Sequence, residues 1–324
     1  MDLLLYIACG IVTFLVLMWV ALCLSTTPLA RTIVFKSENF FMDPETGEKC
    51  EFPSLFDHAS VELSVVVPAY NEETRLPIML DECLAFLEKR CEANPKRSYE
   101  VIIVDDGSTD DTTKVAMSYS EKFGSEKVRV LTLAKNRGKG GAVRLGMLRA
   151  RGRRLLFADA DGASKFEDLE KLESKLVEKI EGQEDGGIVP AIVCGSRAHL
   201  EEDSIATRSY FRTFLMHGFH SLVWFFAVRS IRDTQCGFKL FSRQAVRLCF
   251  PSLHIERWAF DVELLFIAEK LSIPVEEVAI RWTEIDGTKM VPVLSWIQMG
   301  RDLFLIWLRY ASRAWRIRDN SKSD

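Results

Sequence analysis

Four short, mainly apolar runs, each followed by a segment with helical spacing, constrain the fold of this 324-residue chain more than any other feature. The runs cover residues 63–67, 101–104, 128–133 and 155–158. A run of this length and character is typical of a strand that is buried on both faces of a parallel sheet. The alternation therefore predicts an α/β fold, with a Rossmann-like, mostly parallel sheet flanked by helices.

The distribution of charge divides the chain into four parts. Residues 3–24 carry no charge and are long enough to cross a bilayer, so residues 1–30 are predicted to form a transmembrane anchor, with a cleavable signal peptide as the alternative. Residues 31–60 contain a turn at 43–47 and are expected to be a connector. The catalytic domain is predicted at 61–290. Residues 291–324 combine tryptophans with arginines, which is typical of amphipathic helices at a membrane interface, and end in a polar tail.

Charge and cysteine content argue against several classes of protein. A net charge of −4 provides no general attraction to nucleic acid, so no such partner is expected. The eight cysteines form no CxxC pair, and neither a zinc site nor a disulfide framework is indicated. Asp2 before the first apolar run, with Arg31 and Lys36 after it, predicts a single-pass protein whose catalytic domain faces the cytosol. The sequence indicates no oligomeric state.

An apolar segment at 211–228 has two interpretations. It contains His217 and His220 and is bracketed by Arg212 and Arg229. A helix on the membrane surface and a helix buried in the core are both compatible with this pattern, because either lipid or protein would shield its apolar side chains.

Polar side chains follow each of the four predicted strands. Because ligands bind at the carboxyl ends of the strands in such sheets, these groups are expected to converge on one site. The candidate nucleotide-sugar-binding residues are Pro68, Tyr70, Asn71, Glu72, Asp105, Asp106, Arg137, Lys139 and Asp159, and the candidate metal ligands are Asp159 and Asp161.

Each group suits one part of a nucleotide diphosphate. The ring of Tyr70 can stack on a base, and a carboxylate after the second strand can accept an N–H of uracil or guanine. The glycine-bearing segment 136–141 lets backbone N–H groups and Lys139 approach phosphate, although it lacks the Lys-Ser/Thr pair of a kinase phosphate loop. Asp159 and Asp161 offer hard oxygen ligands to Mg²⁺ or Mn²⁺, which would neutralise a leaving diphosphate. Taken singly, each group could instead be a turn or a helix cap.

With these groups in place, the sequence resembles the family 2 glycosyltransferases with the GT-A fold, and more closely the dolichyl-phosphate beta-glucosyltransferases of the endoplasmic reticulum. The resemblance is carried by residues 64–73, 104–108, 135–141, 158–163, 194–200, 232–241 and 257–264. It implies inverting, metal-dependent transfer of glucose from UDP-glucose to dolichyl phosphate, which yields dolichyl beta-D-glucosyl phosphate and UDP for protein N-glycosylation. It also implies attachment to a lipid bilayer, the endoplasmic reticulum membrane.

The resemblance implies further site residues. Arg197, Arg208, Arg212 and Lys289 occur where related polyprenyl-phosphate transferases hold the acceptor and donor phosphates. Asp233 and Asp261 are the implied catalytic carboxylates, as a ligand of a sugar hydroxyl or a weak base, although either could be the structural partner of a nearby arginine.

Two alternatives follow from the same residues. Related mannosyl enzymes commonly have a third metal ligand where this chain has Ala163, which disfavours but does not exclude a dolichyl-phosphate mannose synthase that uses GDP-mannose. An inactive, membrane-bound nucleotide-sugar binder is the other alternative. A processive polysaccharide synthase is disfavoured because the chain has no QxxRW motif and one predicted span.

Overall fold

The computed structural model describes residues 2–181, 189–199, 231–283, 285 and 292–318. Within these ranges the main feature is a seven-stranded sheet with the order β5-β4-β3-β6-β8-β7-β9. The strands are β3 (Val61–Ala69), β4 (Tyr99–Asp105), β5 (Val128–Thr132), β6 (Gly152–Ala158), β7 (Ile192–Ser196), β8 (Phe238–Ser242) and β9 (Val275–Ala279). This architecture confirms the predicted α/β class with a mostly parallel sheet flanked by helices, and the first four strands are those expected from the apolar runs.

The sheet is mostly parallel, with one reversed strand. β5, β4, β3 and β6 are parallel to one another, and β7 is parallel to β9. β8 is antiparallel to both β6 and β7. Because β8 runs in the opposite direction, its first residues lie at the edge of the sheet where β3, β4 and β6 end. That edge is where the predicted polar groups lie.

Helices cover both faces of the sheet because alternate side chains of the buried strands point to opposite faces. Val66, Ile102 and Phe157 contribute to one core, and Val65, Ile103 and Leu156 contribute to the other. The first core includes α4 (Lys139–Met147), α8 (Arg243–Cys249), α9 (Phe260–Lys270) and part of α10 (Pro292–Ala311), and the second includes α2 (Leu76–Ala93), α3 (Thr112–Phe123) and α5 (Leu169–Glu181). Short 3-10 helices, η2 (Phe166–Asp168) and η4 (Phe250–Ser252), precede α5 and follow α8.

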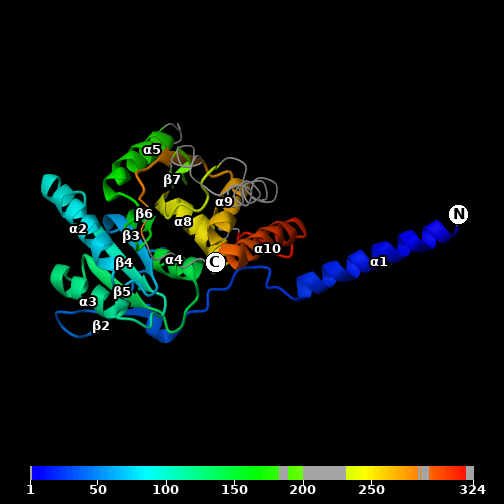
Figure 1. Cartoon of the computed structure of the whole chain (residues 1–324), viewed down its shortest axis with the longest axis horizontal. Helices are drawn as coiled ribbons and strands as arrows, with labels where there is room; N and C mark the ends of the chain where they lie inside the picture. Colours follow the sequence, from blue (N-terminus) through cyan, green and yellow to red (C-terminus); the bar gives the residue numbers. More distant parts are fainter. Residues whose placement is uncertain (1, 182–188, 200–230, 284, 286–291, 319–324) are drawn as a thin grey trace.

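The N-terminal helix α1 (Asp2–Leu24) extends away from the sheet and its helices (Figure 1). In the part of the chain that the structure describes, no helix meets the combined requirement of length and apolarity for crossing a membrane.

The segment expected to be a connector has structure of its own. It contains the 3-10 helix η1 (Lys36–Asn39) and a two-stranded antiparallel sheet of β1 (Phe40–Met42) and β2 (Lys49–Glu51). Glu38 of η1 is completely buried, and Phe41 and Phe52 belong to the first core. Residues of this segment therefore pack against the core on one face of the large sheet.

Candidate active site

A cavity of about 630 Å³ opens at the edge of the sheet where β3, β4, β6 and β7 end and β8 begins. The predicted residues that line it are Pro68, Tyr70, Asn71, Glu72, Asp106, Lys139, Asp159, Asp161, Arg197 and Asp261. Residues from separate strand ends, far apart in the chain, thus share one cavity, as the strand-end pattern predicted.

Asp106 fastens the glycine-bearing segment to the end of β4. Its Oδ1 accepts a hydrogen bond from the backbone N–H of Arg137 at 2.7 Å, and its Oδ2 accepts one from that of Gly138 at 2.8 Å. Burial raises the pKa of Asp106 to about 6, even though these two N–H groups and the Arg137 guanidinium oppose the shift. Gly138 has a positive φ of 88°, a conformation that favours glycine.

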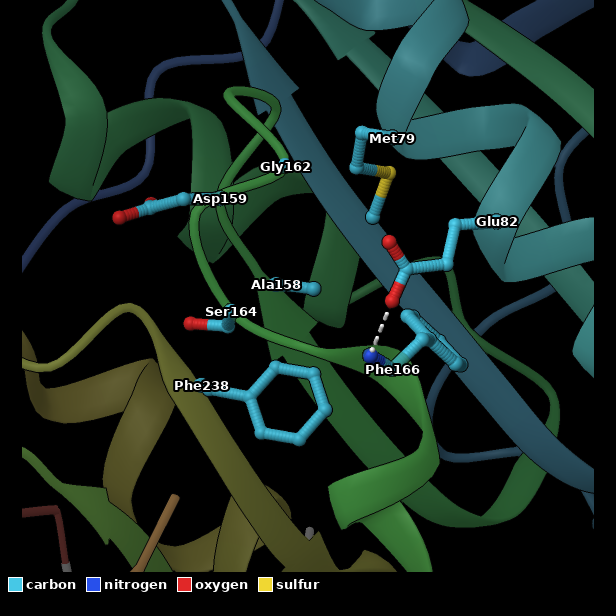
Figure 2. A pocket seen from close by; sticks show the side chains of 8 residues that line it. All are labelled: Met79, Glu82, Ala158, Asp159, Gly162, Ser164, Phe166 and Phe238. Carbon is cyan, nitrogen blue, oxygen red and sulfur yellow. Dashed lines mark hydrogen bonds between the residues drawn. The ribbon is translucent and has the colours of Figure 1, made fainter. Parts of the chain in front are cut away.

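Asp159 lies at the end of β6 and faces the cavity. Its backbone N–H donates to the Gly237 carbonyl at 2.9 Å, and Lys139 Nζ lies 2.7 Å from its Oδ1. Its side chain points away from Met79 and Phe166, which pack beyond the strand end (Figure 2). A Cβ atom on Gly237 would lie 1.9 Å from Asp159 Oδ2, so only glycine leaves room for the carboxylate in this position.

The Asp161 carboxylate is held close to Asp159 on the loop after β6. Its Oδ1 accepts a hydrogen bond from the Ala163 N–H at 2.9 Å. Burial and then the neighbouring Asp159 charge raise the pKa of Asp161. A cation bound by both aspartates would relieve this repulsion, and hard carboxylate oxygens suit Mg²⁺ or Mn²⁺.

Asp261 and Lys239 form an ion pair beneath the cavity. Lys239 Nζ lies 2.6 Å from Asp261 Oδ1 and donates to the Cys236 carbonyl at 2.6 Å. Lys239 is completely buried on β8, and burial disfavours its charged form. The Asp261 carboxylate, together with Cys194 and Cys236, opposes that effect, and the pKa of Lys239 is raised overall, so the lysine stays charged and fixes the carboxylate at the cavity wall.

Asp233 and Arg197 pair in a bidentate arrangement. Arg197 Nε and Nη2 lie 2.8 and 2.9 Å from the two Asp233 oxygens, and the Arg197 backbone N–H donates to Oδ2 at 2.9 Å. Burial opposes ionisation, but the arginine lowers the pKa of Asp233 overall. Arg197 lines the cavity, whereas Asp233 lies behind it as the structural partner of an arginine.

Two further predicted residues support the cavity from behind. Asp105 is buried, and its carboxylate accepts hydrogen bonds from the Ser108 N–H at 2.9 Å and from the Thr113 hydroxyl. The Arg137 guanidinium donates to the Ile33 carbonyl and pairs with Glu38 at 2.8 Å. The arginine expected to approach phosphate therefore attaches the glycine-bearing segment to the N-terminal part of the domain.

Some predictions cannot be compared with the structure, and some lining residues were missed. Arg208, Arg212 and Lys289 lie outside the described residues, as does the whole apolar segment at 211–228. Sequence reasoning did not select the lining residues Arg75, Asn136, Gln235, Gly237, Arg257, Trp258 and Trp282. Several of these fall within the family-like segments 232–241 and 257–264, which were the available signal.

Comparison with known proteins agrees with this geometry. The sequence profile described as "Glycosyl transferase family 2" matches residues 64–250. The chain belongs to glycosyl transferase family 2. This family 2 glycosyltransferase is 63% identical over 299 residues to "Dolichyl-phosphate beta-glucosyltransferase" from Drosophila melanogaster, with 92% of this chain and 90% of that protein covered. The protein of the same name from Mus musculus is 56% identical, with 95% and 94% covered.

A solved structure with the same fold is glucosyl-3-phosphoglycerate synthase from Mycobacterium tuberculosis, in complex with Mn²⁺, UDP-Glc and phosphoglyceric acid. It aligns with this family 2 glycosyltransferase at a TM-score of 0.50 and 18% identity, covering 81% of this chain and 82% of that chain. At this identity the likeness concerns the fold, and it supports the GT-A-like arrangement of the sheet.

Proposed function

We propose that this glycosyltransferase transfers glucose from UDP-glucose to dolichyl phosphate with inversion, giving dolichyl beta-D-glucosyl phosphate and UDP for protein N-glycosylation. The observation that carries the proposal is the 63% identity to "Dolichyl-phosphate beta-glucosyltransferase" over nine-tenths of both chains. The cavity supports it, because the residues expected to contact the base, the phosphates and the metal line one space.

The proposed acceptor suits a cavity built for electrostatic positioning. A phosphate monoester is already anionic near neutral pH, so its oxygen can attack the sugar carbon without a strong general base. We propose that Asp261, which Lys239 holds in position, binds a sugar hydroxyl or acts as a weak base. Asp233 contributes by holding Arg197 at the cavity wall. Most of the rate enhancement is then expected from orientation and charge.

A divalent metal, Mg²⁺ or Mn²⁺, fits the charges around the cavity. Among the described residues that line it, carboxylates outnumber cations, so additional positive charge would favour an incoming diphosphate. When bound, the metal would neutralise the leaving diphosphate as a Lewis acid. We propose Asp159 and Asp161 as its protein ligands, because both carboxylates line the cavity and each raises the cost of the other's charge. The lining carboxylates are those of Glu72, Asp106, Asp159, Asp161 and Asp261, and the lining cations are those of Arg75, Lys139, Arg197 and Arg257.

Attachment to the endoplasmic reticulum membrane, with the catalytic domain facing the cytosol, is a further part of the proposal. It is supported by large apolar side chains that α1 exposes, among them Phe14, Leu17 and Trp19. Such a surface is costly in water and is typical of contact with lipid.

The donor sugar is tested by incubating the full-length protein with dolichyl phosphate and either labelled UDP-glucose or labelled GDP-mannose. We expect label in the lipid fraction from UDP-glucose. Label from GDP-mannose alone would replace our proposal with a mannose synthase, and label from neither would indicate a nucleotide-sugar binder without activity.

The metal ligands are tested separately with Asp161→Asn. This variant should keep its thermal melting profile but lose nearly all transfer, because a neutral amide is a poorer ligand for a hard cation. Wild-type activity should disappear with a chelator and return with Mg²⁺ or Mn²⁺. Full activity of the variant in either metal would remove Asp161 from the metal site.

A further inference from the structure

The four cationic side chains that line the cavity differ in how far their charge is already neutralised. Three of them face a carboxylate: the pairs are Arg75–Glu72 at 2.7 Å, Lys139–Asp159 at 2.7 Å and Arg197–Asp233 at 2.8 Å. The fourth, Arg257, makes no ion pair or side-chain hydrogen bond with any residue that the structure describes, and its side chain is exposed to the cavity. Among the described residues, no carboxylate neutralises its positive charge.

The backbone beneath Arg257 is fixed, although no described residue forms an ion pair or hydrogen bond with its side chain. The Glu256 carbonyl accepts a hydrogen bond from the Gly141 N–H at 2.9 Å. A Cβ atom on Gly138 would lie 2.9 Å from that carbonyl and 3.1 Å from Arg257 Cγ. The stem of Arg257 thus packs directly against Gly138, and a side chain at position 138 would displace it.

Arg257 shares one wall of the cavity with Lys139. The next residue along the chain is Trp258, and Lys139 Nζ lies 5.8 Å from the centre of its ring. Gly138, against which Arg257 packs, also donates its N–H to Asp106. The stem of Arg257 therefore lies beside the glycine-bearing segment 136–141, which carries Lys139 and is held by Asp106.

We propose that Arg257 is a phosphate-binding residue of this cavity, whose guanidinium receives a phosphate group of one of the two substrates. The inference rests on the proposed function, because both UDP-glucose and dolichyl phosphate carry phosphate. A guanidinium can donate two parallel hydrogen bonds to phosphate oxygens, which a lysine cannot. Charged hydrogen bonds of this kind contribute about one to two orders of magnitude in affinity.

Titration calorimetry with uridine and with UDP plus Mg²⁺, together with the KM for dolichyl phosphate, distinguishes the two sources of phosphate. If the donor diphosphate binds here, Arg257→Gln should weaken the binding of UDP about tenfold or more and leave the binding of uridine unchanged. If the acceptor phosphate binds here, the KM for dolichyl phosphate should rise by a similar factor and UDP affinity should stay unchanged. In either case Arg257→Lys should keep part of the affinity that Arg257→Gln loses.

The matched control is Arg153→Gln. Arg153 is an exposed arginine near the start of β6, at the opposite end of that strand from the cavity, and lies 3.9 Å from Glu62. It should behave as the wild type in every measurement. The proposal is overturned if a folded Arg257→Gln variant matches the wild type in both UDP affinity and KM for dolichyl phosphate. Failure of the proposed function would appear differently, as wild-type protein that binds UDP but transfers no glucose.

Discussion

Asp106 is a buried carboxylate whose pKa of about 6 falls near the working range of the protein. Its pKa is raised, so the folded protein begins to protonate this group as the pH falls through 6. Protonation removes the charge that the Arg137 and Gly138 N–H groups bind, and Arg137 and Asp105 are the charged neighbours that modulate it. We therefore expect ionised Asp106 to be the form that orders the glycine-bearing segment 136–141.

Uridine binding should accordingly weaken about tenfold between pH 7 and pH 5, because the binding-competent fraction falls by about that factor. Uridine is the appropriate probe, since it has no phosphate that titrates in this range. Asp106→Asn should bind weakly at both pH values. A wild-type affinity that is independent of pH between 5 and 7 would contradict this role for Asp106.

Gly237 is a position where function and stability should separate. A Cβ atom there would overlap the Asp159 carboxylate, which is the far end of a side chain and can rotate away. Gly237→Ala should therefore shift the melting temperature by only a few degrees but lower the transfer rate about a hundredfold, because a displacement of about 1 Å in a catalytic site is enough for such a loss. Gly10→Ala, with open space around the added methyl group, is the control. Near-normal activity of Gly237→Ala would mean that the position of Asp159 is not critical.

The residues that sequence could identify are those whose role follows from strand ends. Tyr70, Asp106 and Asp159 each follow a predicted strand, and the parallel sheet brings them together. Partners far apart in sequence could not be foreseen in this way. Arg137 pairs with Glu38, 99 positions away, and only the folded chain reveals that this arginine points away from the cavity.

At the scale of elements, Glu38 connects η1 to the glycine-bearing segment 136–141 through a buried ion pair. The Glu38 carboxylate is completely buried and accepts hydrogen bonds from the Phe35 N–H at 2.9 Å, the Ala134 N–H at 3.1 Å and the Arg137 guanidinium. Removing one member of a buried ion pair leaves the other charge unpaired, which costs about 3–5 kcal/mol.

Glu38→Gln should therefore lower the free energy of unfolding by several kcal/mol. It should also weaken the binding of UDP, because the segment that carries Gly138 and Lys139 loses its ion pair with η1. The double variant Glu38→Gln/Arg137→Gln should be more stable than the sum of the two single losses predicts, since it leaves no unpaired charge. Denaturant unfolding and titration calorimetry measure the two effects. Strict additivity in the double variant would show that the pair does not act as a unit.

Elements were predictable where the hydrophobic pattern is continuous. The first four strands of the large sheet have such a pattern, with Arg129 of β5 as an interruption, whereas β8 carries Lys239 at its second position and β9 carries two adjacent glutamates. A charged residue inside a short strand interrupts the apolar signal, and the ion pair with Asp261 is what makes the burial of Lys239 possible. The reversed strand that brings Gly237 to the site was therefore not visible in the sequence pattern.

On the scale of the whole molecule, the segment around the end of α1 is hydrogen-bonded to the segment that follows α10. Trp19 Nε1 donates to the Ser312 carbonyl at 2.9 Å, the Arg316 N–H to the Pro28 carbonyl at 2.7 Å, and Arg318 to the Ala30 carbonyl at 2.7 Å. The second and third of these contacts involve Pro28 and Ala30, which lie beyond the end of α1. The helix can therefore be removed without removing them.

Deleting residues 2–26 should release the protein from the membrane fraction and leave UDP affinity unchanged, because Pro28 and Ala30 remain to bind the C-terminal segment. Flotation of the full-length and shortened proteins with liposomes measures attachment, and calorimetry measures UDP binding. If the shortened protein still floats with the lipid, the amphipathic α10 must bind the membrane as well.

The hydrogen bonds between the two segments also impose an order on biosynthesis. A ribosome makes Arg316 and Arg318 roughly 290 residues after their carbonyl partners at Pro28 and Ala30. The segment that leads from α1 to η1 can therefore dock fully only after these two arginines have left the ribosome. A premature stop codon just after α10 would spare every residue of the cavity and still leave this N-terminal segment without its final contacts.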